Sequence, residues 1–184
     1  MKKISLILAL LLVLIIPTGY SKVIKGVNIP GNYQYFGKNL VLNGTGFRKK
    51  FFIKVYIGAL YLEQKTNDEK IVISAPTKVV KMHFLYKKVK SSQMKDTFKE
   101  GFEKINENLL KESAVQEFLN SVSFDVVKGD EVDLIIDKDM VTVLKNGNKI
   151  GDFKSQALAD ALIKIYVGEE PADSGLKEGL LGKE

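Results

Sequence analysis

Residues 42–63 read LNGTGFRKKFFIKVYIGALYLE, and the second half of this stretch decides the fold class. From Phe51 to Glu63 the residues are mostly β-branched, aromatic or otherwise apolar, which favours a strand. Successive side chains of a strand point to opposite faces, and both alternating sets here are largely apolar. We therefore expect a long strand that is covered on both faces, with a polar exception near Lys54 and Tyr56. Leu40–Asn43 predicts a short strand before it.

The remaining chain predicts further strands and several helices. Strands are expected at Ile71–Ser74, Lys78–Tyr86, Glu131–Asp137 and Met140–Lys145, with Asn146-Gly147 as a turn after the last of them. Apolar spacing predicts one helix at Ser92–Leu110 and another at Phe153–Val167, where Gly168 ends the helix. A further helix is expected between them, beginning at a capping box formed by Ser113 and Gln116. This order predicts an α+β fold with helices packed on a large antiparallel sheet.

The N-terminus has the layout of a secretory signal peptide. Two lysines precede an apolar run from Ile4 to Ile16, and Gly19 and Ser21 supply small residues at positions −3 and −1 of a cut before Lys22. The alternative is an uncleaved N-terminal anchor, although the run is shorter than the roughly 20 residues of a membrane span. We expect residues 1–21 to be the signal peptide, residues 22–184 to form one domain, and the protein to be exported to the periplasm or the medium.

Composition excludes several classes of function. Removal of Lys2 and Lys3 with the signal peptide lowers the formal charge from +6 to +4, which is too modest and too dispersed to favour nucleic acid as a partner. The chain has no cysteine and one histidine, His83, so a zinc site made of these ligands has too few donors. No serine-hydrolase elbow or dinucleotide loop occurs. We expect no metal, no cofactor and no catalytic residue of these types.

Arg48 is the only arginine among 28 strong cations, and it follows Gly44 and Gly46. A guanidinium holds a carboxylate or phenolate through paired hydrogen bonds and keeps its charge when desolvated, which lysine does less well. The glycines would let the backbone turn tightly and bring the side chain close to a ligand. A structural ion pair, or a chance arginine on a loop, explains the residue equally well at this point.

The stretch 42–63 resembles the signature of the chalcone isomerase-like family, in particular its exported bacterial members. The resemblance continues in VVKMHFLYKKV, FKEGFEKINEN, GDF and YVGEEPADSGLKEGLLG, in the expected order along nearly all of residues 22–184. It implies an open-faced β-sandwich of the chalcone isomerase type, with a cleft between sheet and helices. It also implies that Arg48 and Tyr56 are ligand-binding residues, since fatty-acid-binding members hold a carboxylate with an arginine and a tyrosine at these places.

Departures from the enzymes of the family distinguish between its branches. Met94 and Gly101 stand where the isomerases carry a tyrosine and an asparagine, and Ile165 replaces a hydroxyl-bearing residue. Catalysis by electrostatic stabilisation needs such donors. We therefore expect a monomeric binder of a hydrophobic small molecule with an anionic head, either a fatty acid or a flavonoid-like compound. The alternatives are an isomerase, an intramolecular lyase that acts on a conjugated ketone through Arg48 and Tyr56, and a scaffold whose cleft is filled by its own side chains.

Overall fold

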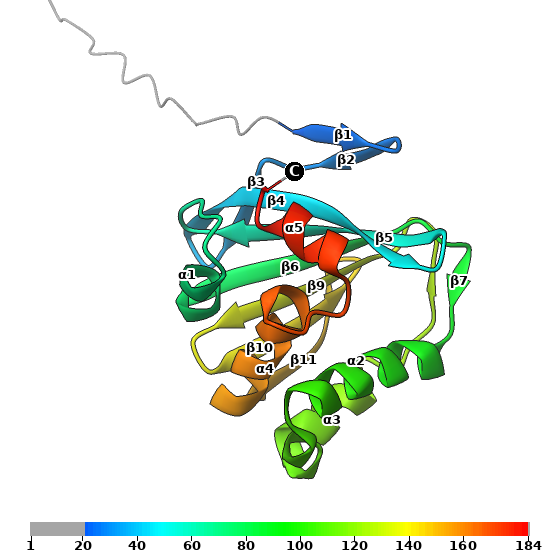
Figure 1. Ribbon diagram of the computed structural model, residues 1–184, viewed down its shortest axis with the longest axis vertical. Helices are drawn as coiled ribbons and strands as arrows, with labels where there is room; N and C mark the ends of the chain where they lie inside the picture. Colours follow the sequence, from blue (N-terminus) through cyan, green and yellow to red (C-terminus); the bar gives the residue numbers. More distant parts are fainter. Residues whose placement is uncertain (1–20, 184) are drawn as a thin grey trace, which may run out of the picture.

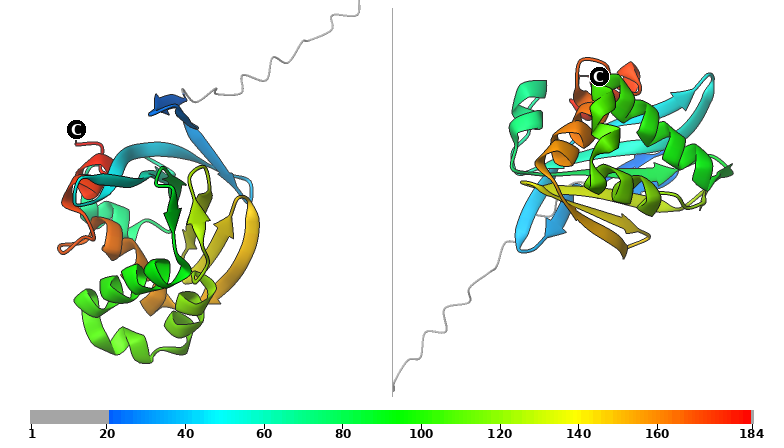
Figure 2. Two further views of the ribbon diagram at one scale, coloured as in Figure 1. Left: turned by 90° about the vertical axis from the view of Figure 1, so that its right-hand side faces the viewer. Right: turned by 90° about the horizontal axis from the view of Figure 1, so that it is seen from below.

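The computed structural model describes residues 21–183, so the predicted signal peptide, apart from Ser21, lies outside the described residues. The strands of the main sheet are β3 (Asn32–Tyr35), β4 (Lys38–Lys50), β5 (Ile53–Leu62), β6 (Thr77–Phe84), β9 (Glu131–Asp137), β10 (Met140–Lys145) and β11 (Asn148–Lys154). They form one antiparallel sheet in the order β11-β10-β9-β6-β5-β4-β3. Figure 2 shows that this sheet is strongly curled. The predicted α+β class is confirmed.

Helices cover one face of the sheet (Figure 1). They are α1 (Glu69–Ser74), α2 (Ser91–Asn106), the 3₁₀ turn η1 (Glu107–Lys111), α3 (Ser113–Ser121), α4 (Gln156–Val167) and α5 (Ser174–Leu180). Two small antiparallel pairs complete the elements, β1 (Lys22–Ile24) with β2 (Val27–Ile29) and β7 (Lys88–Val89) with β8 (Val126–Val127). None of the helices within residues 21–183 has the length and apolarity needed to span a membrane.

Strand β5 is buried on both faces from Tyr56 onward, as its sequence predicts, but Phe51 and Phe52, expected to belong to it, lie in the exposed turn before it. Tyr56, Leu60 and Leu62 belong to the larger core between the sheet and the helices. Ile57, Ala59 and Tyr61 belong to a smaller core on the other face, under β2 and β3. The two alternating sets of apolar side chains therefore support two separate layers of packing.

Three local predictions were wrong. Ile71–Ser74 is helical, because the Asp68 side chain accepts a hydrogen bond from the Lys70 amide and starts α1 there. Ser113 is the first residue of α3 and not its cap, since Glu112 occupies that position and the Gln116 side chain donates to the Leu110 carbonyl instead. Phe153 lies in β11 and α4 begins only after the Ser155 cap.

The segment around Gly44 and Gly46 is also not a turn. It continues β4 to Lys50, and its glycines face α5. A Cβ atom on Gly46 would lie 2.6 Å from the Leu176 carbonyl oxygen, and one on Gly44 would overlap the carbonyl oxygens of Gly179 and Leu180. Because only glycine leaves room at these positions, α5 packs directly on the backbone of β4.

Candidate ligand-binding site

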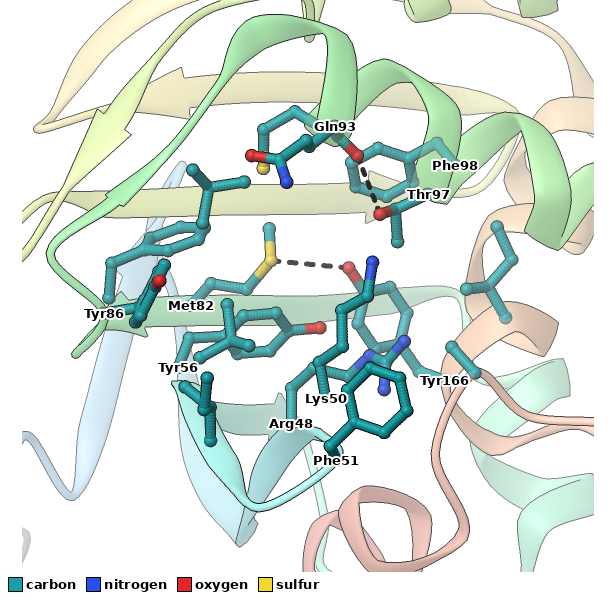
Figure 3. Close-up of a pocket in the computed structure, with 17 residues that line it drawn as sticks. Arg48, Lys50, Phe51, Tyr56, Met82, Tyr86, Gln93, Thr97, Phe98 and Tyr166 are labelled. Atoms are coloured by element: carbon teal, nitrogen blue, oxygen red, sulfur yellow. Dashed lines mark hydrogen bonds between the residues drawn. The ribbon is translucent and has the colours of Figure 1, made fainter.

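A cavity of about 300 Å³ lies between the sheet and helices α2 and α4 (Figure 3). Most of its wall is apolar, formed by Val55, Met82, Phe84, Met94, Phe98 and Ile165. Polar side chains are fewer: Arg48, Lys50, Tyr56, Tyr86, Gln93, Thr97 and Tyr166. A mainly apolar cavity with a small number of polar groups is typical of a site for a small hydrophobic ligand.

Strand pairing and helix periodicity place the lining residues. Arg48 of β4 and Tyr56 of β5 are register partners, so both reach the same end of the cavity. Gln93 and Thr97 lie four residues apart on α2, and Thr97 donates its hydroxyl hydrogen to the Gln93 carbonyl. Ile165 and its neighbour Tyr166 come from α4.

Two of the three positions singled out for the enzyme branch line the cavity. Met94 and Ile165 both contribute apolar surface to it. Gly101 does not line the cavity, because it faces α4: a Cβ atom there would lie 2.8 Å from Cδ1 of Ile165. The absence of a side chain at Gly101 therefore lets α2 and α4 pack closely.

Arg48 is held at the rim by contacts that use one of its nitrogens. Nη1 donates to the Lys49 carbonyl at 2.6 Å and lies 3.5 Å from Oδ2 of Asp173. Asp173 also accepts from the Lys49 amide and, through Oδ1, from the Leu176 amide as the N-cap of α5. In the described part of the chain these contacts leave Nε and Nη2 of Arg48 without a hydrogen bond. An ion pair and a free donor pair thus coexist on one guanidinium.

Two buried tyrosines complete the polar end of the cavity. Burial raises the pKa of Tyr56 to about 12, although the positive charge of Arg48 and a hydrogen bond with Tyr166 oppose the shift. Burial also raises the pKa of Tyr166 well above its ordinary value. The Tyr166 hydroxyl lies 3.5 Å from Sδ of Met82, a weak acceptor. The single hydroxyl hydrogen of Tyr166 serves Tyr56 or Met82, so the hydroxyl hydrogen of Tyr56 is the one left to donate to an anion.

Arg48 and Tyr56, both named from the sequence, lie together at the cavity, and that they bind a ligand stays a prediction. Tyr166 and Asp173 were not predicted. The signal for Tyr166 was weak, because a tyrosine within an apolar helical stripe reads as core. Asp173 precedes a short helix that the glycine-rich sequence 174–182 did not predict.

His83 lies away from this cavity, on the face of the sheet that carries the smaller core. Its Nδ1 is 3.0 Å from Oε1 of Glu131, and Lys81 bridges Glu131 and Asp133 at 2.7 and 3.0 Å. The Tyr33 hydroxyl donates to the other oxygen of Asp133. His83 is thus a buried strand residue in an ion-pair network. Residues 21–183 contain no cluster of histidine and carboxylate side chains arranged to hold a metal ion.

Comparisons with known proteins agree with this geometry. None of the curated proteins matches the chain by sequence. The crystal structure of a fatty-acid binding protein from Arabidopsis thaliana superposes with a TM-score of 0.71 and 18% sequence identity, covering 89% of this chain and 97% of that one. At this identity the likeness establishes the fold. The sequence profile described as chalcone isomerase-like matches residues 21–182, and the chain therefore belongs to the chalcone isomerase-like family.

Proposed function

We propose that the protein is an exported, monomeric binder of fatty acids or similar hydrophobic carboxylates, which it holds without chemical change. The observation that carries this proposal is the distribution of polarity in the cavity. Donors from Arg48, Tyr56 and Tyr166 gather at one end, and the rest of the wall is mainly apolar. An acyl chain with a carboxylate head matches both parts.

The free donors of Arg48 suit a carboxylate in particular. Nε and Nη2 form a planar pair of donors that can hold a carboxylate through two parallel hydrogen bonds. Hydrogen bonds between charged groups are about twice as strong as neutral ones. The hydroxyl of Tyr56 adds a neutral donor beside it, and the hydrogen bond with Tyr166 supports that hydroxyl. The fatty-acid binding protein that shares the fold supports the same substrate class.

Calorimetric titration with a fatty acid and with its methyl ester tests the proposal. The ester keeps the acyl chain but lacks the negative head group, so we expect it to bind at least about tenfold more weakly than the acid. Mass analysis of lipids extracted from protein purified from its native host should identify a carboxylic acid. Equal binding of acid and ester, or no binding of either, would refute the proposal.

An intramolecular lyase of the chalcone isomerase type is the second candidate. It is favoured by the placement of a guanidinium next to two phenols, an arrangement that could stabilise an oxyanion. Against it, Met94 and Ile165 line the cavity with apolar side chains and supply no further donor. We expect no loss of chalcone absorbance above the uncatalysed rate. A stereoselective flavanone product that disappears in Arg48→Ala would promote the lyase.

The scaffold alternative is less well supported, because the cavity of about 300 Å³ falls within the roughly 300–1,000 Å³ of ligand sites and is not filled by the protein's own side chains.

The export part of the proposal rests on the sequence of residues 1–21. N-terminal sequencing of the secreted protein should give Lys22 within a residue or two. Recovery of intact Met1 from membranes would support the anchor instead.

A further inference from the structure

The turn between β4 and β5 exposes three consecutive large apolar side chains. Phe51 is 87% exposed, Phe52 102% and Ile53 47%. Single exposed hydrophobic residues are common on protein surfaces, but a contiguous apolar group on a projecting turn marks an interaction site. We call residues 49–54, KKFFIK, the hairpin tip.

The backbone of the hairpin tip does not favour a phenylalanine. Phe51 has φ of 55°, in the left-handed region that glycine and asparagine occupy with less strain. A bulky aromatic residue at such a position in solvent has no folding advantage. The ring therefore lies in solvent with no gain from packing.

Positive charge surrounds the exposed rings. Lys49 and Lys50 precede them, Lys54 follows, and no acidic residue occurs between Arg48 and Leu62. The segment 85–86 is hydrogen-bonded to the Val55 carbonyl, which brings Lys87 and Lys90 to the same end of the molecule as the hairpin tip (Figure 1). Lys88 lies between them and is paired with Asp125. Aromatic rings within a basic surface are complementary to the headgroup region of an anionic bilayer.

The hairpin tip is also part of the cavity rim. Lys50, Phe51 and Ile53 line the cavity, and Tyr86 and Val89 line it as well. Phe52 does not. A surface that contacts a bilayer through the hairpin tip would therefore have the cavity opening beside the lipid.

We propose that the hairpin tip docks on an anionic phospholipid bilayer, and that the fatty acid enters and leaves the cavity while the protein is docked. The entry and exit of the fatty acid rest on the proposed function, whereas docking on the bilayer does not. Phe52 inserts into the interface, the lysines contact lipid phosphates, and the ligand moves between bilayer and cavity with little exposure to water.

A single-tryptophan variant provides a direct test, because the chain contains no tryptophan. In Phe52→Trp, emission should shift to the blue when phosphatidylcholine vesicles containing phosphatidylglycerol are added, and brominated lipid should quench it. Vesicles of phosphatidylcholine alone, or high salt, should give little shift. The control is Phe36→Trp: Phe36 is 89% exposed in a turn at the opposite end of β4, also at positive φ. Its emission should not change.

Vesicle sedimentation with Phe52→Ser and Phe36→Ser completes the experiment. Phe52→Ser should lower vesicle affinity about tenfold and slow transfer of fatty acid from vesicles, while its calorimetric affinity for free fatty acid equals that of the wild type. Phe36→Ser should behave as the wild type. Docking is refuted if Phe52→Ser sediments normally, if both variants lose binding equally, or if Phe52→Ser only dissolves a dimer or a complex with another protein. Wild-type docking without any fatty-acid binding would refute the proposed function and leave the docking surface standing.

Discussion

Arg48 combines two interactions that lysine could not reproduce together. Its Nη1 contacts the Lys49 carbonyl and Asp173, and the remaining donors of this cavity-lining side chain have no hydrogen bond within the described residues. Arg48→Lys keeps the charge but loses the paired donors of the guanidinium. We therefore expect fatty-acid affinity to fall about ten- to a hundredfold, which corresponds to one charged hydrogen bond of roughly 1.5–3 kcal/mol. Calorimetry of the folded variant measures this.

A smaller effect is expected for Tyr56→Phe, which removes one neutral hydroxyl. Tyr61→Phe is its matched control, because Tyr61 lies on the same strand but donates to the Pro30 carbonyl on the other face. If Arg48→Lys lowers only the melting temperature and leaves affinity unchanged, Arg48 has a structural role alone.

Asp173 should oppose the anionic ligand that we propose Arg48 attracts. Its carboxylate lies 3.5 Å from the guanidinium and contributes to raising the pKa of Tyr56, after burial as the main cause. Asp173→Asn retains a side-chain oxygen to cap α5 but removes the negative charge. Fatty-acid affinity should therefore rise, on the order of 1 kcal/mol or about fivefold. Weaker binding in this variant would show instead that Asp173 is needed to position Arg48.

Among the elements, the contact of α5 with β4 tolerates the least change. Gly44→Ala would push a methyl group into the carbonyls of Gly179 and Leu180, and overpacking of this kind costs roughly 1–3 kcal/mol of stability. The melting temperature should drop by several degrees. Gly175→Ala is the control, since a Cβ atom there lies 3.4 Å from the nearest atom, Oδ1 of Asp173. An equal loss in both variants would argue against close packing as the cause.

Elements with a strong, uniform pattern could be predicted from sequence, and those shaped by distant partners could not. The alternation in β5, the β9–β10 pair and the apolar stripe of α2 are local signals, and the structure confirms them. The continuation of β4 through Gly44 and Gly46 depends on α5, far away in the chain. Ile71–Ser74 has strand-forming residues, but the cap at Asp68 outweighs their propensity.

The candidate site shows the same division. Arg48 and Tyr56 came from the family resemblance, and β4–β5 pairing places them together. Tyr166 and Asp173 reach the cavity end through the packing of α4 and α5, which no local pattern encodes.

For the whole molecule, the lone histidine predicts a pH dependence of stability. Burial lowers the pKa of His83, opposed by the charge of Glu131. As the pH falls, the unfolded chain, whose histidine has a pKa near 6.5, therefore binds its proton first. The free energy of unfolding should decrease below about pH 6.5, by at most about 1.4 kcal/mol per pH unit.

Denaturant unfolding between about pH 5 and 7 measures this slope. Burial would raise the pKa of Glu131, but hydrogen bonds and charges from Lys81 and His83 lower it, so Glu131 stays ionised in this range. His83→Asn keeps a donor for Glu131 without a titrating ring and should abolish the slope. A slope that persists in this variant would assign it to other groups.

The packing of α5 on β4 also affects the order in which the chain folds. Asn43 donates to the Leu180 carbonyl across 137 residues of chain, and the groove that receives α5 exists only after β4 has paired with β5. Contacts of such sequence separation form late, because the entropy of closing the intervening loop must first be overcome by other interactions. A nascent chain therefore completes its sheet while Arg48 still lacks Asp173. We therefore expect the cavity rim to be assembled in the final step and the proposed ligand binding to be acquired last.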